Sequence, residues 1–369
     1  MKKILILANI DMGLYNFRKE LLQTLIAQGN EVYISLPMGP RVKDMEEMGC
    51  KFIETPVDRR GMNPIADLKL FFGYRKILKQ LKPDVVLTYT IKPNIYGGLA
   101  CRMAKVPYLS NITGLGSAFQ QEGFLKKLVH FLYRIALKRA NTVVFENEGN
   151  QDLFLQQQIV TKSQAQLMKG AGVNLEEYRF CEYPRIQENI VFLFIGRIMK
   201  EKGVDELFSV ARRIHQEGAN AEFHFIGFYE EDYKDEIEEL EQTGIIRFFG
   251  YQQDVKPFIR NAHCFVLPSY HEGMANTLLE NASMGRPLIT SDIFGCREAV
   301  SVGENGFLCK RKDRDSLYFA VQSFLNLSHE EKAMMGKKSR ELMEREFDRN
   351  GIVSHIGQLV NDMMSEMKS

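Results

Sequence analysis

The sequence predicts an α/β protein made of two Rossmann-like parallel-sheet domains that face each other across a cleft. Three observations indicate this class. The chain of 369 residues is longer than one ordinary hydrophobic core supports. Short apolar runs alternate with amphipathic segments along it, and this alternation occurs twice. Strand–helix–strand alternation is typical of parallel sheets that helices cover on both faces.

The first half of the chain supplies one domain, which we place at residues 1–180. Its helical pattern is clearest in "FRKELLQTLIAQG", where apolar residues recur every three or four positions before a glycine. The predicted strands are "KILILA", "EVYISL", "DVVLTY", "PYLSNI" and "NTVVFEN".

The second half repeats the pattern and supplies a domain at residues 181–350. The polar stretch "RFCEYPRIQEN" predicts a linker near 180–188. The predicted strands are "IVFLFIG", "EFHFIG", "IRFFG", "HCFVLPS", "PLITSD" and "GFLCK", with "VDELFSVARRIHQEG" as a helix. The final segment, about 351–369, is amphipathic and is expected to pack back on the first domain. Its apolar stripe is Ile352, Ile356, Leu359, Val360 and Met363.

Composition argues against several classes of protein. No apolar run approaches the roughly 20 residues that span a bilayer, and the run from Ile4 to Ala8 is too short for a signal peptide. The six cysteines are scattered without a C-x-x-C, which indicates reduced packing residues in the cytosol. The seven histidines form no ligand cluster, so we expect no metal site and no cofactor.

Charge is unevenly divided between the two halves. Residues 1–165 carry 23 Lys and Arg against 14 Asp and Glu, whereas residues 166–369 carry 25 against 33. A basic half suggests that one domain faces an anionic partner, although chance and a solvated acidic surface would give the same split. Nucleic acid is not expected, because no basic run is interleaved with stacking aromatics.

The loop "GRIMKEKG" follows the predicted strand "IVFLFI" and carries Arg197 and Lys202. Ligands of open α/β sheets bind at the carboxyl edge, and two fixed cations beside a helix start suit a diphosphate. The alternative is a pair of ordinary surface charges.

The stretch "SYHEGMANTLLENASMG" places Glu272 in a loop and Glu280 inside a helix. The two glutamates would lie about 12 Å apart along a helix axis. Between them, the backbone N–H groups of Ala275, Asn276 and Thr277 would point outward as unpaired donors. Two carboxylates that bind hydroxyl groups would then bracket a phosphate-binding helix start. The alternative is a solvated helix face and a loop charge.

These two motifs, about 70 residues apart, resemble the retaining glycosyltransferases of family 4, which have the GT-B fold and an E-x(7)-E signature. "NIDMGLYNFRKELLQTL" and "NITGLGSAF" are similar to a bacterial branch that adds N-acetylgalactosamine, α-1,3, to a sugar on undecaprenyl diphosphate. The resemblance implies a UDP-sugar donor, a lipid-linked saccharide acceptor, and a metal-independent reaction. It places Arg197 and Lys202 on the diphosphate, Glu272 on the donor sugar and Glu280 on the ribose.

The same resemblance assigns further residues to the two substrates. Those expected at the donor are Gly13, Tyr251, Gly273, Met274, Ala275, Asn276 and Thr277. Those expected near the acceptor are Asn16, Arg18, Thr113 and Gly114. The chain departs from many relatives in having Gly13 alone instead of a Gly-Gly pair, and no histidine in "NITGLGS". We therefore assign no side-chain base.

The single D-x-D, Asp313 to Asp315, has a spacing that metal sites of another glycosyltransferase fold use. We interpret Asp313 as a helix N-cap with acids in the first turn, because "RDSLYFAVQSFL" follows it.

The segment 123–140, "GFLKKLVHFLYRIALKRA", contains no acidic residue. Lys126, His130, Arg134 and Lys138 recur every four residues, and apolar residues fill the other faces. Such a helix suits an anionic membrane surface. The segment "FFGYRKILKQLK" also combines basic and apolar residues without an acidic one. The alternative is a core helix with a solvated basic edge.

Together these features predict a cytoplasmic enzyme that associates peripherally with the inner face of the cell membrane. Two alternatives remain: a UDP-sugar 2-epimerase of the same fold, and a non-catalytic module that binds nucleotide sugars.

Overall fold

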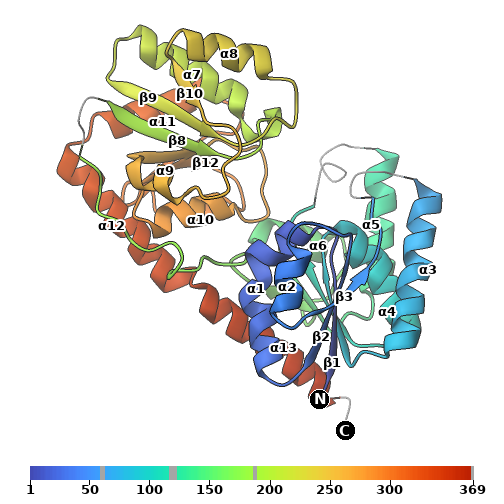
Figure 1. The fold of residues 1–369 in the computed structure, drawn as a ribbon. Coiled ribbons are helices and arrows are strands. Elements are labelled where there is room, and N and C mark those ends of the chain that lie inside the picture. The colour runs from blue at the N-terminus through green and yellow to red at the C-terminus, as the bar shows by residue number, and fades with distance from the viewer. Residues whose placement is uncertain (59–62, 116–122, 186–188, 367–369) are drawn as a thin grey trace. The chain divides into compact units, whose positions relative to one another are not determined.

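The computed structural model describes residues 1–58, 63–115, 123–185 and 189–366, which form two compact units (Figure 1). The first unit comprises residues 1–171 and 350–369, and the second comprises residues 172–349. Each unit has its own parallel sheet flanked by helices, which confirms the α/β fold class predicted from the sequence.

The first unit is built on a seven-stranded sheet of order β3-β2-β1-β4-β5-β6-β7. The strands are β1 (Lys3–Leu7), β2 (Glu31–Leu36), β3 (Lys51–Glu54), β4 (Val85–Tyr89), β5 (Tyr108–Ile112), β6 (Thr142–Phe145) and β7 (Ala165–Leu167). Every residue of β4, β5 and β6 is buried, which explains why β4 and β6 are mostly apolar. The strand order reverses between β1 and β4, so side chains that follow these two strands meet at one crevice.

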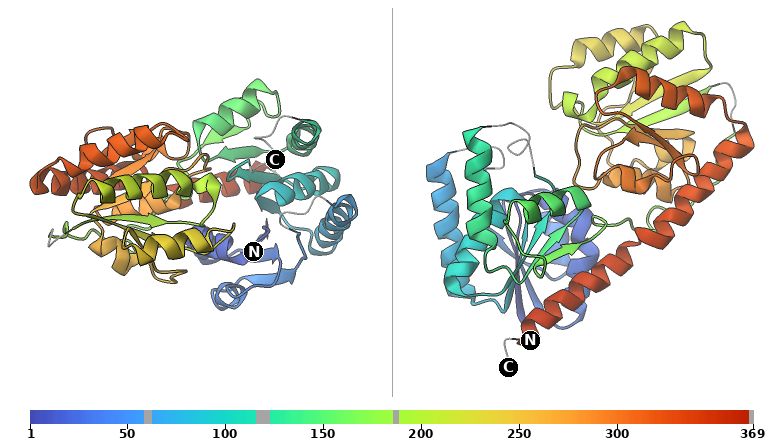
Figure 2. Two further views of the ribbon diagram at one scale, coloured as in Figure 1. Left: turned by 90° about the horizontal axis from the view of Figure 1, so that it is seen from above. Right: turned by 180° about the vertical axis from the view of Figure 1, so that it is seen from behind.

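The helices of this unit are α1 (Asp11–Ala27), α2 (Val42–Glu47), α3 (Pro64–Leu81), the π-helix η1 (Pro93–Gly97), α4 (Gly98–Ala104), α5 (Phe124–Leu137), α6 (Glu148–Gln156) and α13 (Arg349–Glu366). Asn63 caps α3 by accepting a hydrogen bond from the Ile65 N–H at 3.0 Å. The C-terminal helix α13 belongs to this unit (Figure 2). Its Ile356 and Val360 are buried in the same hydrophobic cluster as Leu21 of α1.

The second unit is built on a six-stranded sheet of order β10-β9-β8-β11-β12-β13. The strands are β8 (Ile190–Ile195), β9 (Ala221–Ile226), β10 (Ile246–Phe248), β11 (Cys264–Leu267), β12 (Leu288–Ser291) and β13 (Gly306–Cys309). The α-helices are α7 (Val204–Gln216), α8 (Lys234–Gln242), α9 (Lys256–Asn261), α10 (Asn276–Ser283), α11 (Arg314–Leu325) and α12 (His329–Glu346). Two short 3₁₀ helices are η3 (Lys200–Lys202) and η4 (Arg297–Ala299). Phenylalanines fill much of the core, and Phe192 of β8 stacks on Phe223 of β9 with ring centroids 5.0 Å apart.

The boundary between the units differs from the predicted one at residue 180. Residues 172–180 belong to the second unit, because Val173 bridges to Asp348 and its N–H donates to the Phe347 carbonyl at 2.8 Å. The stretch that follows is also anchored. The buried guanidinium of Arg286 donates to the Cys181 and Glu182 carbonyls at 2.6 and 3.0 Å.

Two features of the fold bear on the expectations from composition. The six cysteines are unpaired, and all except the half-buried Cys181 are buried, as expected of packing residues. Within the ranges given above, no helix has both the length and the apolarity that crossing a bilayer requires.

Candidate functional site

The two predicted motifs of the second unit meet at one edge of its sheet. Strands β8 and β11 are parallel neighbours, and the strand order reverses between them. The loop 196–203 follows β8 and the loop 268–275 follows β11, so both loops leave the same carboxyl edge. Such a reversal is where open α/β sheets bind their ligands.

Backbone contacts hold these loops together, and two of them require glycine. Gly203 has φ +73°, and a Cβ at this position would lie 2.1 Å from the Pro268 carbonyl oxygen. Gly295 has φ +85°, and its Cβ would lie 2.5 Å from the Gly273 carbonyl oxygen. A hydrogen bond also joins the two loops, because the Tyr270 N–H donates to the Glu201 carbonyl at 2.9 Å. The positions of the site residues are therefore set by packed backbone.

Lys202 and Glu272 form the central ion pair of this edge. Lys202 Nζ lies 2.5 Å from Glu272 Oε1, and Ser269 Oγ donates to the same oxygen at 2.7 Å. Both charged side chains are mostly buried, with 17% and 13% exposed. Burial opposes ionisation of Glu272, but the charge of Lys202 and these hydrogen bonds prevail and hold its pKa below the ordinary value. Glu272 is therefore a carboxylate at neutral pH.

Arg197, the other predicted cation, is paired with a residue that sequence reasoning missed. Its Nη1 lies 3.4 Å from Glu230 Oε2, and the carboxylate side chain is 17% exposed. Glu230 follows β9, the neighbour of β8, so it leaves the sheet at the same carboxyl edge. Its signal in the sequence is the acidic "FYEED" directly after the strand "EFHFIG".

The start of α10 differs in part from the expectation of three free donors. The Ala275 N–H donates to the Gly295 carbonyl at 2.8 Å, so it is already bonded. Among the described residues, the N–H groups of Asn276 and Thr277 have no hydrogen-bond partner. The Asn276 Oδ1 is also buried without one. Met274 has its side chain in the hydrophobic core, so only its backbone could meet a ligand.

Glu280 lies on α10 in an environment unlike that of Glu272. Burial raises the pKa of Glu280 to about 7, although the charge of Arg349 and a hydrogen bond from Tyr178 oppose this shift. Tyr178 and Arg349 lie far from Glu280 in sequence, and no local pattern in the sequence marked either. The two glutamates of the E-x(7)-E motif therefore differ in charge state near neutral pH.

An exposed aromatic pair stands at the neighbouring strand ends. Phe228 follows β9 and Tyr251 follows β10, and their rings are 6.4 Å apart at an interplanar angle of 60°. Their side chains are 48% and 56% exposed. Tyr251 was expected at the donor, whereas Phe228 was not.

The residues predicted near the acceptor are not equally available in the first unit. Arg18 is buried, with its Nη2 2.7 Å from Glu146 Oε1, so it is committed to a structural ion pair. Gly13, which the sequence analysis places at the donor, lies inside the first turn of α1 and not in a loop. Asn16 is exposed on α1, while Thr113 and Gly114 follow β5 and are half-buried.

The crevice of the first unit instead carries two unsatisfied polar atoms. Asn9 follows β1 and Thr90 follows β4, two residues beyond the paired Leu7 and Thr88. Asn9 Oδ1 and Thr90 Oγ1 are buried and have no hydrogen-bond partner in the described parts of the chain. Thr90 has φ +73°, a strained conformation for a β-branched residue.

The D-x-D motif has a local explanation. Asp313 caps α11 by accepting from the Ser316 N–H at 2.8 Å, which confirms the N-cap interpretation. Asp315 pairs with Arg213 at 3.2 Å. Within the residues that the structure describes, no group of three or more His, Cys, Asp or Glu side chains could hold a metal ion.

The basic helix α5 presents a different face from the predicted one. Lys126 and His130 are half-buried, whereas Arg134 and Lys138 are exposed as expected. The exposed face also contains Lys127 and two apolar side chains, Leu128 and Phe131, which are 39% and 59% exposed. The reason is the helical period of 3.6 residues, because a strict four-residue repeat drifts around the helix.

Both units match models of known protein families. Residues 3–147 match the family model described as glycosyl transferase 4-like, and residues 180–342 match the model for glycosyl transferases group 1. An N,N'-diacetylbacillosaminyl-diphospho-undecaprenol alpha-1,3-N-acetylgalactosaminyltransferase from Campylobacter jejuni is 29% identical over 327 residues, which cover 84% of this chain and 86% of the relative. An Escherichia coli UDP-Gal:alpha-D-GlcNAc-diphosphoundecaprenol alpha-1,3-galactosyltransferase is 26% identical, with 71% of each chain covered.

A solved structure agrees in fold over the whole chain. The Anabaena protein HepE in complex with UDP and glucose superposes with a TM-score of 0.75 at 16% identity, covering 98% of this chain and 100% of its own. The two parallel-sheet units, the paired motifs at the β8 and β11 edge and these matches lead to one assignment. The chain belongs to the glycosyltransferases of the GT-B fold, in the family-4-like group that its motifs resemble.

Proposed function

We propose that this glycosyltransferase moves an N-acetylhexosamine from a UDP-sugar to a saccharide on undecaprenyl diphosphate, with retention of configuration and without a metal. The observation that carries the proposal is the buried Lys202–Glu272 pair at the strand-order reversal of the second unit. The names of the Campylobacter and Escherichia relatives support the lipid-linked acceptor, and the UDP-bound neighbour supports the donor.

The diphosphate of the donor would bind where positive charge and free donors converge. Lys202 and Arg197 supply the cations, and the N–H groups of Asn276 and Thr277 supply backbone donors from the start of α10. These groups need no metal ion to balance the charge that develops on departing UDP. Fixed donors aimed at a developing charge are usually the largest single contribution to catalysis.

The remaining parts of the donor match the side chains on either side. Glu272 is ionised and would accept hydrogen bonds from hydroxyl groups of the donor sugar. Glu280 would do the same for the ribose. The exposed rings of Phe228 and Tyr251 offer a surface on which the uracil base could stack. The ligand would thus extend from the β11 loop towards the ends of β9 and β10.

The acceptor saccharide would bind at the β1–β4 crevice of the first unit. Asn9 Oδ1 and Thr90 Oγ1 are uncharged and lack partners in the described chain, so they suit sugar hydroxyls better than an anion. Asn16, Thr113 and Gly114 would line the same edge. Arg18 would act indirectly by fixing Glu146 and α1.

In the chemical step, the bond between the anomeric carbon and the UDP oxygen would be replaced by a glycosidic bond to the acceptor on the same face of the sugar. The acceptor hydroxyl oxygen attacks the anomeric carbon as the bond to the UDP oxygen breaks. The acceptor proton passes to that departing phosphate oxygen, so no side-chain base is needed. This route is consistent with the absence of a histidine in "NITGLGS".

The first unit would dock on the anionic inner face of the membrane. On α5 the exposed face combines Lys127, Arg134 and Lys138 with Leu128 and Phe131. On α3, Ile65, Leu68 and Phe72 are exposed together with basic residues. An amphipathic surface of this kind buries its apolar side chains at the headgroup boundary while its cations attract anionic lipids.

A donor panel tests the proposal. The protein is incubated with UDP-N-acetylgalactosamine, UDP-N-acetylglucosamine, UDP-galactose or UDP-glucose, with and without a lipid-linked saccharide, in buffer containing a chelator. We expect acceptor-dependent transfer of an N-acetylhexosamine, with the same anomeric configuration in product and donor by NMR. Epimerised sugar without acceptor would instead identify an epimerase, and binding without turnover would identify a non-catalytic module. Loss of activity on chelation, with recovery on adding magnesium or manganese, would contradict metal independence.

A further inference from the structure

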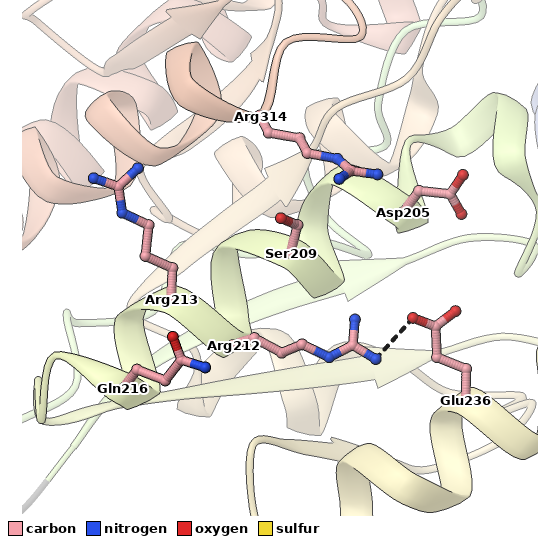
Figure 3. Close-up of a pocket in the computed structure, with 7 residues that line it drawn as sticks. All are labelled: Asp205, Ser209, Arg212, Arg213, Gln216, Glu236 and Arg314. Carbon is pink, nitrogen blue, oxygen red and sulfur yellow. Dashed lines mark hydrogen bonds and ion pairs between the residues drawn. The ribbon is translucent and has the colours of Figure 1, made fainter.

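A polar cavity lies on the second unit, between helices α7, α8 and α11 (Figure 3). Its volume is about 600 Å³, and Arg197, Lys202 and Glu272 do not line it. The lining residues are Asp205, Ser209, Arg212, Arg213, Gln216, Glu236 and Arg314. All seven side chains are polar or charged, and three of them are arginines.

The cavity exists because α7 turns one polar stripe outward. Asp205, Ser209, Arg212 and Gln216 recur at helical spacing on α7, while its opposite face is buried in the core. Arg314 reaches in from the first turn of α11, and Glu236 from α8 (Figure 3).

Several of these charges already have partners. Arg212 Nη2 lies 2.9 Å from Glu236 Oε1, and Asp205 Oδ1 accepts from the Tyr233 hydroxyl at 2.6 Å. Arg213 is fully engaged, because it pairs with Glu217 and Asp315 and its guanidinium lies 3.5 Å from the centre of the Tyr318 ring. Arg213 therefore shapes the wall and is not expected to bind a ligand.

Three groups in the cavity remain uncommitted. Across the described residues, the side chains of Arg314, Ser209 and Gln216 make no hydrogen bond or ion pair. Ser209 lies on the floor between Arg314 and Arg212 (Figure 3). Arg314 alone offers five N–H donors, and Arg212 uses only part of its own in the bond to Glu236. The cavity therefore has an excess of donors at its centre, with carboxylate oxygens of Asp205 and Glu236 on one side.

From this arrangement we infer a binding site for a phosphorylated sugar, distinct from the donor site. The phosphate would accept hydrogen bonds from Arg314, Arg212 and Ser209, because a guanidinium matches a phosphate with two parallel bonds. The sugar hydroxyls would donate to the free oxygens of Asp205 and Glu236. The volume suits a small ligand and exceeds what a bare phosphate fills. The lining residues include no apolar side chain, which disfavours a lipid chain or an aromatic ring.

Calorimetry with glucose 6-phosphate tests the site, with inorganic phosphate and glucose as comparators at constant ionic strength. We expect the sugar phosphate to bind at least about tenfold more tightly than either comparator, because both halves of the cavity contribute. Arg314→Gln should weaken its binding by about tenfold or more, the worth of one charge-assisted contact. Lys310→Gln removes an equal charge from the exposed loop before α11 and should leave binding unchanged.

One further variant separates this cavity from the donor site. Arg197→Ala removes a cation from the β8–α7 loop and leaves the cavity lining intact, so binding of the sugar phosphate should persist. Melting temperatures close to that of the parent would show that each variant is folded. The inference fails if Arg314→Gln binds like the parent, if binding disappears in Arg197→Ala, or if inorganic phosphate binds as tightly as the sugar phosphate, which would indicate an adventitious ion only.

Discussion

Lys202 Nζ lies 2.5 Å from Glu272 Oε1, although 70 residues separate the two in the chain. The pair forms because Lys202 follows β8 and Glu272 follows β11, two strands that are neighbours only through the fold of the sheet. Within this pair each charge neutralises the other. A bound donor would break this ion pair but give each group a new partner, because its diphosphate would contact Lys202 and its sugar hydroxyls would contact Glu272. The net free-energy cost of the exchange would be low.

Glu272→Gln should therefore impair transfer without impairing UDP binding. The amide keeps the shape of the side chain but loses the charge that strengthens hydrogen bonds to sugar hydroxyls. We expect the transfer rate to fall by about tenfold to hundredfold. Because Lys202 loses its internal partner, UDP affinity by calorimetry should stay the same or rise. A UDP affinity that falls as far as the rate would show that Glu272 contacts the nucleotide instead.

Glu230→Gln should tighten the binding of UDP. The Glu230 carboxylate holds Arg197 at 3.4 Å, so a diphosphate bound as we propose would compete with it for the guanidinium. We expect a severalfold gain in affinity, whereas Arg197→Ala should lose affinity. Asp232→Asn, in the same loop and exposed, is the matched control and should bind UDP like the parent. Weaker binding in Glu230→Gln would mean that Glu230 positions Arg197 productively.

Glu280 should make donor binding depend on pH near neutrality. Its pKa is raised to about 7, so the carboxylate that we propose for the ribose hydroxyls becomes populated between about pH 6 and pH 8. The affinity for a UDP-sugar should increase over this range in the parent protein. In Glu280→Gln the affinity should be lower at pH 8 and nearly independent of pH. An equal pH dependence in both proteins would assign it to another group.

The raised pKa of Glu280 also affects folding stability. Stability should decrease as the pH rises, whereas donor affinity should increase. Because the folded pKa of Glu280 exceeds the ordinary value of 4.5, the folded state binds the proton more tightly than the unfolded state. The contribution of this group to stability should fall as the pH rises from about 4.5 to 7. Chemical denaturation of the parent and of Glu280→Gln across this range would measure the difference.

The sequence predicts the sheets and the two motif loops because those signals are local. Apolar runs mark the strands, and "GRIMKEKG" and "EGMANTLLE" directly follow two of them. The partners are missed because they come from packing between distant segments. Glu230 reaches Arg197 from a neighbouring strand end, and Tyr178 and Arg349 reach Glu280 from the two ends of the second unit.

The same limit applies in the first unit. The sequence places Arg18 near the acceptor, and it does not reveal that Glu146, 128 residues away, pairs with Arg18 inside the fold. Thr90 is unremarkable in the sequence, and only the backbone of the folded chain gives it φ +73° and an unsatisfied hydroxyl.

Charge reversal on α5 tests the membrane proposal. We expect the triple variant of Lys127, Arg134 and Lys138 to Glu to bind anionic liposomes well over tenfold more weakly. Each basic residue near such a surface contributes about 1 kcal/mol. Transfer to a short water-soluble acceptor should survive. Reversal of Lys43, Lys105 and Lys162, which are exposed elsewhere on the first unit, is the control and should have a smaller effect. Equal losses in the two variants would assign binding to net charge and not to α5.

The most direct measurement is the transfer rate of two lysine variants from one turn of the chain. Lys200 and Lys202 both lie in η3, but Lys200 is exposed while Lys202 is mostly buried against Glu272. We expect Lys202→Ala to slow transfer by about 10² to 10³, the usual cost of losing one donor to a developing charge. Lys200→Ala should stay within about twofold of the parent, and both should melt near the parent temperature. Near-parent turnover in a folded Lys202→Ala variant, or equal losses in both variants, would contradict the role of the Lys202–Glu272 pair in transfer.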